Sequence, residues 1–115
     1  MDMLKKAFRL KTKEDFERVF RKGKPLFFGA VACKIVPNTL GFIRIGFSFG
    51  KKHISSAVSR NRLRRVLIEP FSQDPQFKEV HSSVDIAFFS VKKVSKEQIE
   101  DFASVGESVV RYIYK

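Results

Sequence analysis

The sequence contains no tryptophan, a single cysteine and only two histidines. Because Cys33 is alone, no disulfide can form within the chain, and a reducing compartment is indicated. His53 and His81 are not at ligand spacing with Cys33, so the sequence offers no zinc site. No apolar run approaches the roughly 20 residues of a membrane-spanning helix, and the N-terminus lacks a signal peptide's apolar region. We therefore expect a cytoplasmic protein with no membrane partner and no metal site.

Acidic residues are also scarce: 12 Asp and Glu stand against 23 Lys and Arg, and the formal net charge is +11. Such an excess costs folding free energy through self-repulsion and normally indicates a polyanionic partner. A nucleic acid fits best, because each neutralised phosphate releases counterions and adds affinity. A charge that serves only to keep the protein in solution is the alternative.

The chain does contain enough apolar material for one core, since 43% of its 115 residues are hydrophobic. A single domain over 1–115 is expected, with 1–11 as a basic, extended or loosely packed arm. Periodicity and capping patterns predict an α+β fold, a two-layer α/β sandwich in the order α-β-β-α-β-α. The expected elements are a helix from Thr12 to Lys22, strands over 26–36 and 43–49, a helix from Ser55 or Ser56 to Glu69 before Pro70, a strand over 84–91, and a helix from Ser95 towards Tyr112.

The densest feature is the run Arg60-Asn61-Arg62-Leu63-Arg64-Arg65, which has four arginines in six residues of a predicted helix. At about 100° per residue, Arg60, Arg64 and Arg65 share one arc with Asn61, and apolar residues fill much of the opposite side. Guanidinium groups match phosphate oxygens bidentately, whereas clustered cations without an anion repel one another. A solvated charged face is the alternative, but such faces usually mix signs, and no acid occurs between Lys51 and Ile68. The pattern favours a helix that binds a polyanion.

Two predicted strands carry small and basic residues on one face, namely Ala30, Ala32 and Lys34 on the first and Arg44, Gly46 and Ser48 on the second. If both faces lie on the same side of the sheet, they form a shallow floor suited to single-stranded RNA. Phe16 and Phe20, one turn apart on the first predicted helix, offer stacking surfaces for bases. Two phenylalanines at this spacing are also typical of a core, and both interpretations stay open.

The segment Phe47-Ser48-Phe49-Gly50-Lys51-Lys52, together with the arginine-rich run 60–65, resembles the signature of bacterial ribonuclease P protein subunits. That family has an RNR motif of the form R-N-R-x-[KR]-R on a helix that follows a strand ending in two basic residues. Further similarities in order and spacing occur at Arg9-Leu10, Asp15-Phe16, Val19-Phe20, Arg44-Ile45-Gly46, Asp85-Ile86 and Lys92. The resemblance therefore spans nearly the whole chain.

The resemblance implies a left-handed β-α-β crossover through the arginine-rich helix, as in the second domain of ribosomal protein S5, where ordinary rules predict a right-handed one. It also implies a ribonucleoprotein endonuclease in which ribonuclease P RNA, with Mg²⁺ held mainly by that RNA, hydrolyses a phosphodiester of precursor tRNA. The protein then has no catalytic residue of its own. Contacts to the RNA subunit are expected at Lys51, Lys52, Arg60, Asn61, Arg62, Arg64 and Arg65. Contacts to the 5′ leader are expected at Arg9, Lys11, Phe16, Phe20, Lys34, Arg44 and Ser48, with a further basic contact at Lys92.

The sequence departs from the family pattern at four positions. Lys34 stands where relatives often have an aromatic residue, Ile68 and Val91 stand where a basic residue is common, and Pro70 interrupts the arginine-rich helix. Three other functions stay open: a basic ribosomal protein or RNA chaperone, a DNA-binding transcription factor, and an autonomous nuclease. The mixed α/β order argues against a helix-turn-helix, so no DNA partner is expected. A nuclease would need a metal-binding acid cluster, which the sequence lacks.

Overall fold

The computed structural model describes residues 8–73 and 83–113. The elements in chain order are α1 (Lys13–Lys22), β1 (Lys24–Phe28), β2 (Val31–Pro37), β3 (Arg44–Ser48), α2 (Ala57–Gln73), β4 (Val84–Ser90), the 3-10 helix η2 (Lys96–Phe102) and α4 (Ala103–Ile113). The strands form one four-stranded sheet in the order β1-β2-β4-β3. The pair β3–β4 is parallel, and the other two pairs are antiparallel. The α+β fold and the expected order of its main elements are confirmed.

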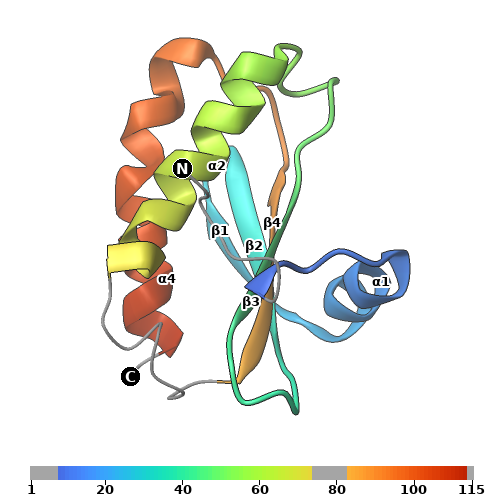
Figure 1. The fold of residues 1–115 in the computed structure, drawn as a ribbon. Helices are drawn as coiled ribbons and strands as arrows, with labels where there is room; N and C mark the ends of the chain where they lie inside the picture. Colours follow the sequence, from blue (N-terminus) through green and yellow to red (C-terminus); the bar gives the residue numbers. More distant parts are fainter. Residues whose placement is uncertain (1–7, 74–82, 114–115) are drawn as a thin grey trace.

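The helices cover the two faces of the sheet differently (Figure 1). α2 and α4 lie side by side on one face and enclose the main core, whereas α1 packs on the opposite face against β2 and β4. α2 connects β3 to β4, which are neighbours and parallel, so it is the crossover helix of a β-α-β unit. The left hand of this crossover, which the resemblance implies, stays a prediction.

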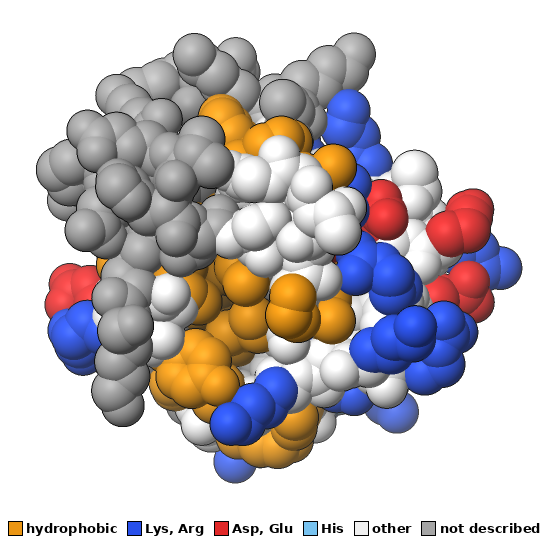
Figure 2. Space-filling model, turned by 90° about the horizontal axis from the view of Figure 1, so that it is seen from below, with side chains coloured by type: hydrophobic (Ala, Val, Ile, Leu, Met, Phe, Trp, Pro, Cys, Tyr) orange, Lys and Arg blue, Asp and Glu red, His pale blue; other side chains and the backbone are white. Residues whose placement is uncertain are grey.

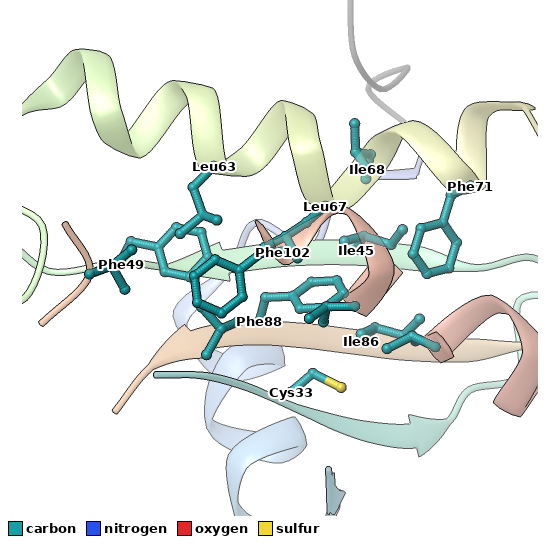
Figure 3. Close-up of a cluster of buried hydrophobic side chains, with 14 of the residues drawn as sticks. Cys33, Ile45, Phe49, Leu63, Leu67, Ile68, Phe71, Ile86, Phe88 and Phe102 are labelled. Carbon is teal, nitrogen blue, oxygen red and sulfur yellow. The ribbon is translucent and has the colours of Figure 1, made fainter. Parts of the chain in front are cut away.

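The main core holds α2 firmly against the sheet (Figure 3). Leu63, Leu67 and Phe71 follow one another at helical spacing and are fully buried. The ring of Phe71 meets the buried ring of Phe88 edge to face, with centroids 6.5 Å apart. Each fully buried side chain of this kind contributes roughly 1.5–3 kcal/mol to stability. Burial raises the pKa of the Cys33 thiol to about 12, so this residue packs as a small apolar side chain.

A second, smaller core lies beneath α1. It is formed by buried residues on both sides of that interface, with two partly buried aromatic rings against them: Leu10, Val19, Val36 and Ala87, with Phe16 and Phe20. Gly46 allows the close approach of these elements, because a Cβ atom at this position would lie 2.5 Å from the Phe16 ring and 2.8 Å from Leu10 Cβ. Thr12 caps α1, its hydroxyl accepting a hydrogen bond from the Asp15 backbone N–H at 3.1 Å, as the capping pattern predicts.

Residues 8–10 of the basic N-terminal arm lie along the edge of the sheet. Arg9 forms a parallel bridge with Ile45 at the free edge of β3, and the Leu10 N–H donates a hydrogen bond to the Ile45 carbonyl at 3.0 Å. Leu10 is buried, so of the two alternatives for the arm, extended or loosely packed, the segment 8–10 fits the extended one. Residues 1–7 of the predicted arm lie outside the described residues.

The segment 26–36 is not a single strand, as the alternation predicted, but most of a hairpin. β1 and β2 are joined at Gly29, whose φ of 73° is the left-handed conformation that a tight turn needs and that glycine adopts without strain. The reversal of the chain places Ala30 in the main core, not on the face that Ala32 and Lys34 share. The sheet therefore gains an additional edge strand.

The predicted end of the arginine-rich helix near Glu69 is also wrong, because α2 continues through Pro70 to Gln73. A Cβ atom at Gly106 of α4 would lie 2.5 Å from the Leu67 carbonyl oxygen and 3.0 Å from the Pro70 ring, so the two helices touch there. Continuing the helix buries Phe71 completely, and this burial offsets the hydrogen bond that proline cannot donate.

The helix expected from Ser95 begins with the predicted capping box, but its first turns are the 3-10 helix η2.

The close contact at Gly46 predicts that Gly46→Ala lowers the free energy of unfolding by roughly 1–3 kcal/mol, because the added methyl group collides with Phe16 and Leu10. Gly50→Ala is the matched control, since nothing lies within 4 Å of a Cβ atom there, and its effect should stay within about 0.5 kcal/mol. Urea unfolding of both variants measures the difference. Equal effects of the two substitutions would show that α1 is not packed closely on β3.

Candidate nucleic-acid interface

The arginine-rich side of α2 carries cations for which the protein supplies few counterions. Arg64 donates a hydrogen bond to the Asn61 side-chain oxygen at 2.6 Å, and neither Arg64 nor Arg65 has a carboxylate partner among residues 8–73 and 83–113. Partial burial, and then the neighbouring charge of Arg60, lower the pKa of Arg64. Arg64 stays charged at neutral pH, but its charge is less well stabilised in the free protein than in water, and a bound anion would stabilise it.

The other two arginines of the run have partners inside the protein. Arg60 donates hydrogen bonds to the carbonyl oxygens of Ile54 at 2.7 Å and Ser55 at 3.1 Å, at the entrance to α2. Arg62 forms an ion pair with Glu100 of η2. Both side chains thus help to place α2, and the charge of Arg62 is compensated by the protein's own carboxylate.

A group of exposed lysines lies where the parallel strands β3 and β4 end. Lys51 and Lys52 follow β3, and Lys92 and Lys93 follow β4. Two contacts connect these loops: the His53 ring nitrogen Nδ1 lies 3.1 Å from the Ser90 hydroxyl, and the Val94 N–H donates to the His53 carbonyl at 3.1 Å. Because the carboxyl ends of parallel neighbours meet at one edge of a sheet, the four lysines form a basic rim.

The sheet face towards α1 has the small and basic residues that the alternation predicts, apart from Ala30. Lys34, Ala87 and Gly46 face one another across β2, β4 and β3, and Ala32, Phe89 and Ser48 form the next row. Lys34 Nζ donates a hydrogen bond to the Phe20 carbonyl at 2.6 Å, at the end of α1. Since Phe16 and Phe20 are only partly buried, they belong to the small core and still present ring surface outside it.

Near the N-terminal part of α1, the buried carboxylate of Asp85 forms ion pairs with two arginines. Asp85 of β4 has no exposed surface and accepts hydrogen bonds from Arg44 Nε at 2.9 Å, from Arg44 Nη2 at 2.7 Å and from Asn38 Nδ2 at 2.8 Å. Arg18 of α1 also forms an ion pair with Asp85, and Arg44 reaches Asp15 of α1 at 3.2 Å. Arg44, an expected leader contact, is thus engaged by carboxylates from β4 and α1.

The Asp85 carboxyl is held in its charged form by this network. Burial alone would raise its pKa, but hydrogen bonds from Arg44 and Asn38, the charge of Arg44 and the hydrogen bond from Arg18 together lower it below its ordinary value. The hydrogen bond to Asp85 correspondingly raises the pKa of Arg44, against the opposing effect of its burial. The network joins β3, β4 and α1 and fixes the position of α1 on the sheet.

A cavity of about 370 Å³ lies at the N-terminal end of α1. Three of the expected leader contacts line it, namely Arg9, Lys11 and Arg44. The other lining residues are Thr12, Asp15, Leu40 and Phe42. The other expected leader contacts, Phe16, Phe20, Lys34 and Ser48, lie along α1 or on the sheet beyond it. On the side of the molecule where α1 lies, Figure 2 shows Lys and Arg side chains mixed with acidic ones. The surface around α1 is therefore less purely cationic than the run 60–65.

Sequence reasoning missed three residues of these surfaces. Asp85 was noticed only within the family resemblance, although a single acid inside the apolar strand Val84–Ser90 is a signal for a buried ion pair. Phe89 follows the buried Phe88 and so points to the opposite face, which strand alternation alone could have indicated. Phe27 lies opposite Ala32 on β1, a position that depends on the hairpin at Gly29 and that the alternation over 26–36 does not reveal.

The sequence model of the family described as Ribonuclease P matches residues 4–112, nearly the whole chain. The chain belongs to the ribonuclease P protein family. A ribonuclease P protein component from Thermoanaerobacter sp. (strain X514) is 33% identical over 113 residues, which cover 98% of this chain and 92% of that relative. One from Legionella pneumophila (strain Corby) is 39% identical over 71 residues, or 62% of each chain.

Solved structures of ribonuclease P proteins share the fold. The protein from Thermotoga maritima superposes with a TM-score of 0.68 at 27% identity, covering 92% of this chain and 94% of its own. The protein from Staphylococcus aureus reaches a TM-score of 0.71 at 24% identity, covering 96% and 100%. Membership of the ribonuclease P family makes the chain a protein component of a tRNA-processing ribonucleoprotein with an RNA partner. Of the helices in the described ranges, none has the length and apolar character needed to cross a bilayer.

The buried network predicts that Asp85→Asn lowers the free energy of unfolding at neutral pH by about 3 kcal/mol or more, because Arg44 and Arg18 lose their shared carboxylate. Asp101→Asn, which removes an exposed acid of η2, is the matched control and should have little effect. Chemical denaturation measures both variants.

The effect of Asp85→Asn should depend on pH. The pKa of Asp85 is lowered in the folded protein, so its stabilising contribution is present above the unfolded-state pKa of about 3.9 and is lost as the pH falls through the folded value. The stability difference between the wild-type protein and Asp85→Asn should therefore shrink on acidification below about pH 4. A difference that stayed constant from neutral to strongly acidic pH would contradict the charged network.

Proposed function

We propose that this protein binds the catalytic RNA of ribonuclease P through the basic side of α2 and holds the 5′ leader of precursor tRNA on the α1 side of the sheet. The observation that carries the proposal is the lack of carboxylate partners for Arg64 and Arg65 among the described residues. These two guanidinium groups stand on a helix whose other side is locked into the core by Leu63 and Leu67. A phosphate backbone supplies the missing counterions.

The RNA-subunit surface then consists of the exposed side of α2 and the nearby lysines. Arg64 and Arg65 bind phosphate oxygens directly, and Asn61 is exposed beside them. Lys51 and Lys52 extend the surface along the loop that leads into α2. Arg60 and Arg62, which are bonded within the protein, orient the helix and add positive charge to it.

The leader surface lies along α1. Arg9 and Lys11 attract phosphates at one end, while the partly exposed rings of Phe16 and Phe20 stack on bases. Lys34 and Ser48 supply polar contacts on the sheet, and Lys92 adds charge at its edge. Arg44 is a positioning residue in this account, because its guanidinium is bonded to Asp85 and Asp15.

The division of labour in this proposal is the one that the family resemblance implies. Hydrolysis of the phosphodiester is assigned to the RNA subunit with Mg²⁺ that this RNA holds. The protein neutralises phosphates where the RNA subunit and the leader approach each other, and it thereby replaces part of the cation atmosphere that the RNA alone requires. The reaction is the removal of the leader from precursor tRNA in the cytoplasm.

The central test is reconstitution with the cognate ribonuclease P RNA. The protein should stimulate correct 5′ cleavage of precursor tRNA at magnesium concentrations where the RNA alone is slow, and the protein alone should cleave nothing. Gel analysis of the cleavage products at a series of magnesium concentrations measures the effect. Binding to RNA without any stimulation of cleavage would instead favour a general RNA chaperone.

A second test concerns α2. Arg64→Ala and Arg65→Ala, separately and together, should weaken binding to the RNA subunit and make the dependence of log Kd on log salt concentration shallower by about 1 per arginine. Arg111→Ala on α4 removes the same charge from another helix and serves as the control, with its salt slope expected to equal that of the wild-type protein. Salt slopes that were the same for the double variant and the wild-type protein would rule out α2 as the contact.

A further inference from the structure

An exposed aromatic ring on the edge strand β1 is not explained by the fold. Phe27 has 67% of its surface exposed, so no described element covers it. Phe27 lies opposite Ala32 of β2, Ala32 lies opposite Phe89 of β4, and Phe89 lies opposite Ser48 of β3. Residues opposite one another in a sheet point to the same face. These four residues therefore form a row across the whole sheet, on the side where α1 packs.

The row continues the aromatic surface of α1. The rings of Phe20 and Phe89 meet edge to face with centroids 5.3 Å apart, and the rings of Phe16 and Phe20 are stacked at 6.2 Å. Ala32 lies between Phe27 and Phe89 in this row and is fully buried. β1 and β4 are two strand spacings apart, about 10 Å, so Phe27 and Phe89 present separate ring surfaces.

Basic side chains lie beside the row. Lys51, Lys52, Lys92 and Lys93 are exposed where β3 and β4 end, next to the row that contains Ser48 and Phe89. Lys34 stands two residues along β2 from Ala32 and so on the same face. The sequence has no acidic residue from Arg18 to Ile68, a segment that includes β1, β2 and β3. A partner with planar apolar groups on an anionic backbone, which is the chemistry of single-stranded RNA, matches this surface.

We propose that Phe27 and Phe89 form a base-stacking platform for single-stranded RNA, with Lys34, Lys92 and Lys93 as its phosphate contacts. The proposal rests on the proposed function, because the leader of precursor tRNA is the single strand that this face would receive. It extends the leader surface from α1 across the sheet to the edge strand β1. Phe27 is the more exposed ring and is therefore the better probe of the platform.

The experiment uses a fluorescent single-stranded RNA of about ten nucleotides and an abasic strand of the same length. The wild-type protein should bind the strand with bases more tightly than the abasic strand, because only bases can stack. Phe27→Ala should weaken binding to the strand with bases about tenfold and leave binding to the abasic strand unchanged. Fluorescence anisotropy titrations at one fixed salt concentration measure all four dissociation constants.

Conservative variants separate stacking from general apolar contact. Phe27→Tyr keeps a ring and should bind like the wild-type protein, whereas Phe27→Leu keeps apolar volume without a ring and should behave like Phe27→Ala. Tyr112→Ala removes an exposed aromatic residue from α4, on the other side of the sheet, and should not change either affinity.

Phe89 is partly buried, so Phe89→Leu is the variant that tests it while keeping apolar volume, and it too should lose affinity only for the strand with bases.

Two results would overturn the platform. One is an equal loss of affinity for both strands in Phe27→Ala. The other is a wild-type dimer, seen by sedimentation, that Phe27→Ala dissociates, since the exposed ring would then serve a second copy of the chain.

The outcomes also separate this proposal from the proposed function. Stimulation of cleavage by the wild-type protein, together with unchanged RNA binding by Phe27→Ala, would remove the platform and leave the subunit role intact. Base-dependent binding that requires Phe27, without any stimulation of cleavage, would keep the platform and remove the leader as its ligand.

Discussion

The buried carboxylate of Asp85 is the contact on which the arrangement of the basic sheet face depends. It draws Arg44 of β3 and Arg18 of α1 to one point on β4, and Asp15 adds a second carboxylate beside them. A buried charge of this kind is tolerated only because its hydrogen bonds are satisfied. The result is a fixed position for α1, and with it a fixed relation between the Phe16 and Phe20 rings and the sheet beneath them.

The carboxylates in this network pair with some of the protein's arginines and leave others without an internal counterion, available to a partner. The described ion pairs use Asp85 and Asp15 on the α1 side and Glu100 against Arg62, whereas Arg64 and Arg65 receive no carboxylate from the described residues. Because the same helix is anchored by its apolar side, the backbone that carries these cations is held in place before any partner arrives. Such preorganisation lowers the entropy lost on binding. A protein with a net charge of +11 thus folds by compensating only part of its own charge.

Much of this arrangement could be predicted from local patterns. The caps at Thr12 and Ser95 and the apolar spacing of Leu63 and Leu67 depend on residues a few positions apart, and these predictions are confirmed. The shared face of Lys34 and Gly46 follows from strand alternation and is confirmed by the register.

The rest depends on contacts between distant parts of the chain. Asp85 is 41 positions from Arg44, and no local pattern indicates that they meet. Pro70 remains within α2 because α4 packs on it at Gly106, which a proline rule cannot anticipate. The alternation over 26–36 hides the turn at Gly29, and with it the exposed position of Phe27.

The most direct test of the central claim is a structure of this protein bound to its cognate ribonuclease P RNA. The claim is that a phosphate backbone is the counterion for the arginine side of α2. The account predicts phosphate oxygens within hydrogen-bond distance of the guanidinium groups of Arg64 and Arg65. A complex in which both groups faced solvent, or were paired with the protein's own carboxylates, would contradict it.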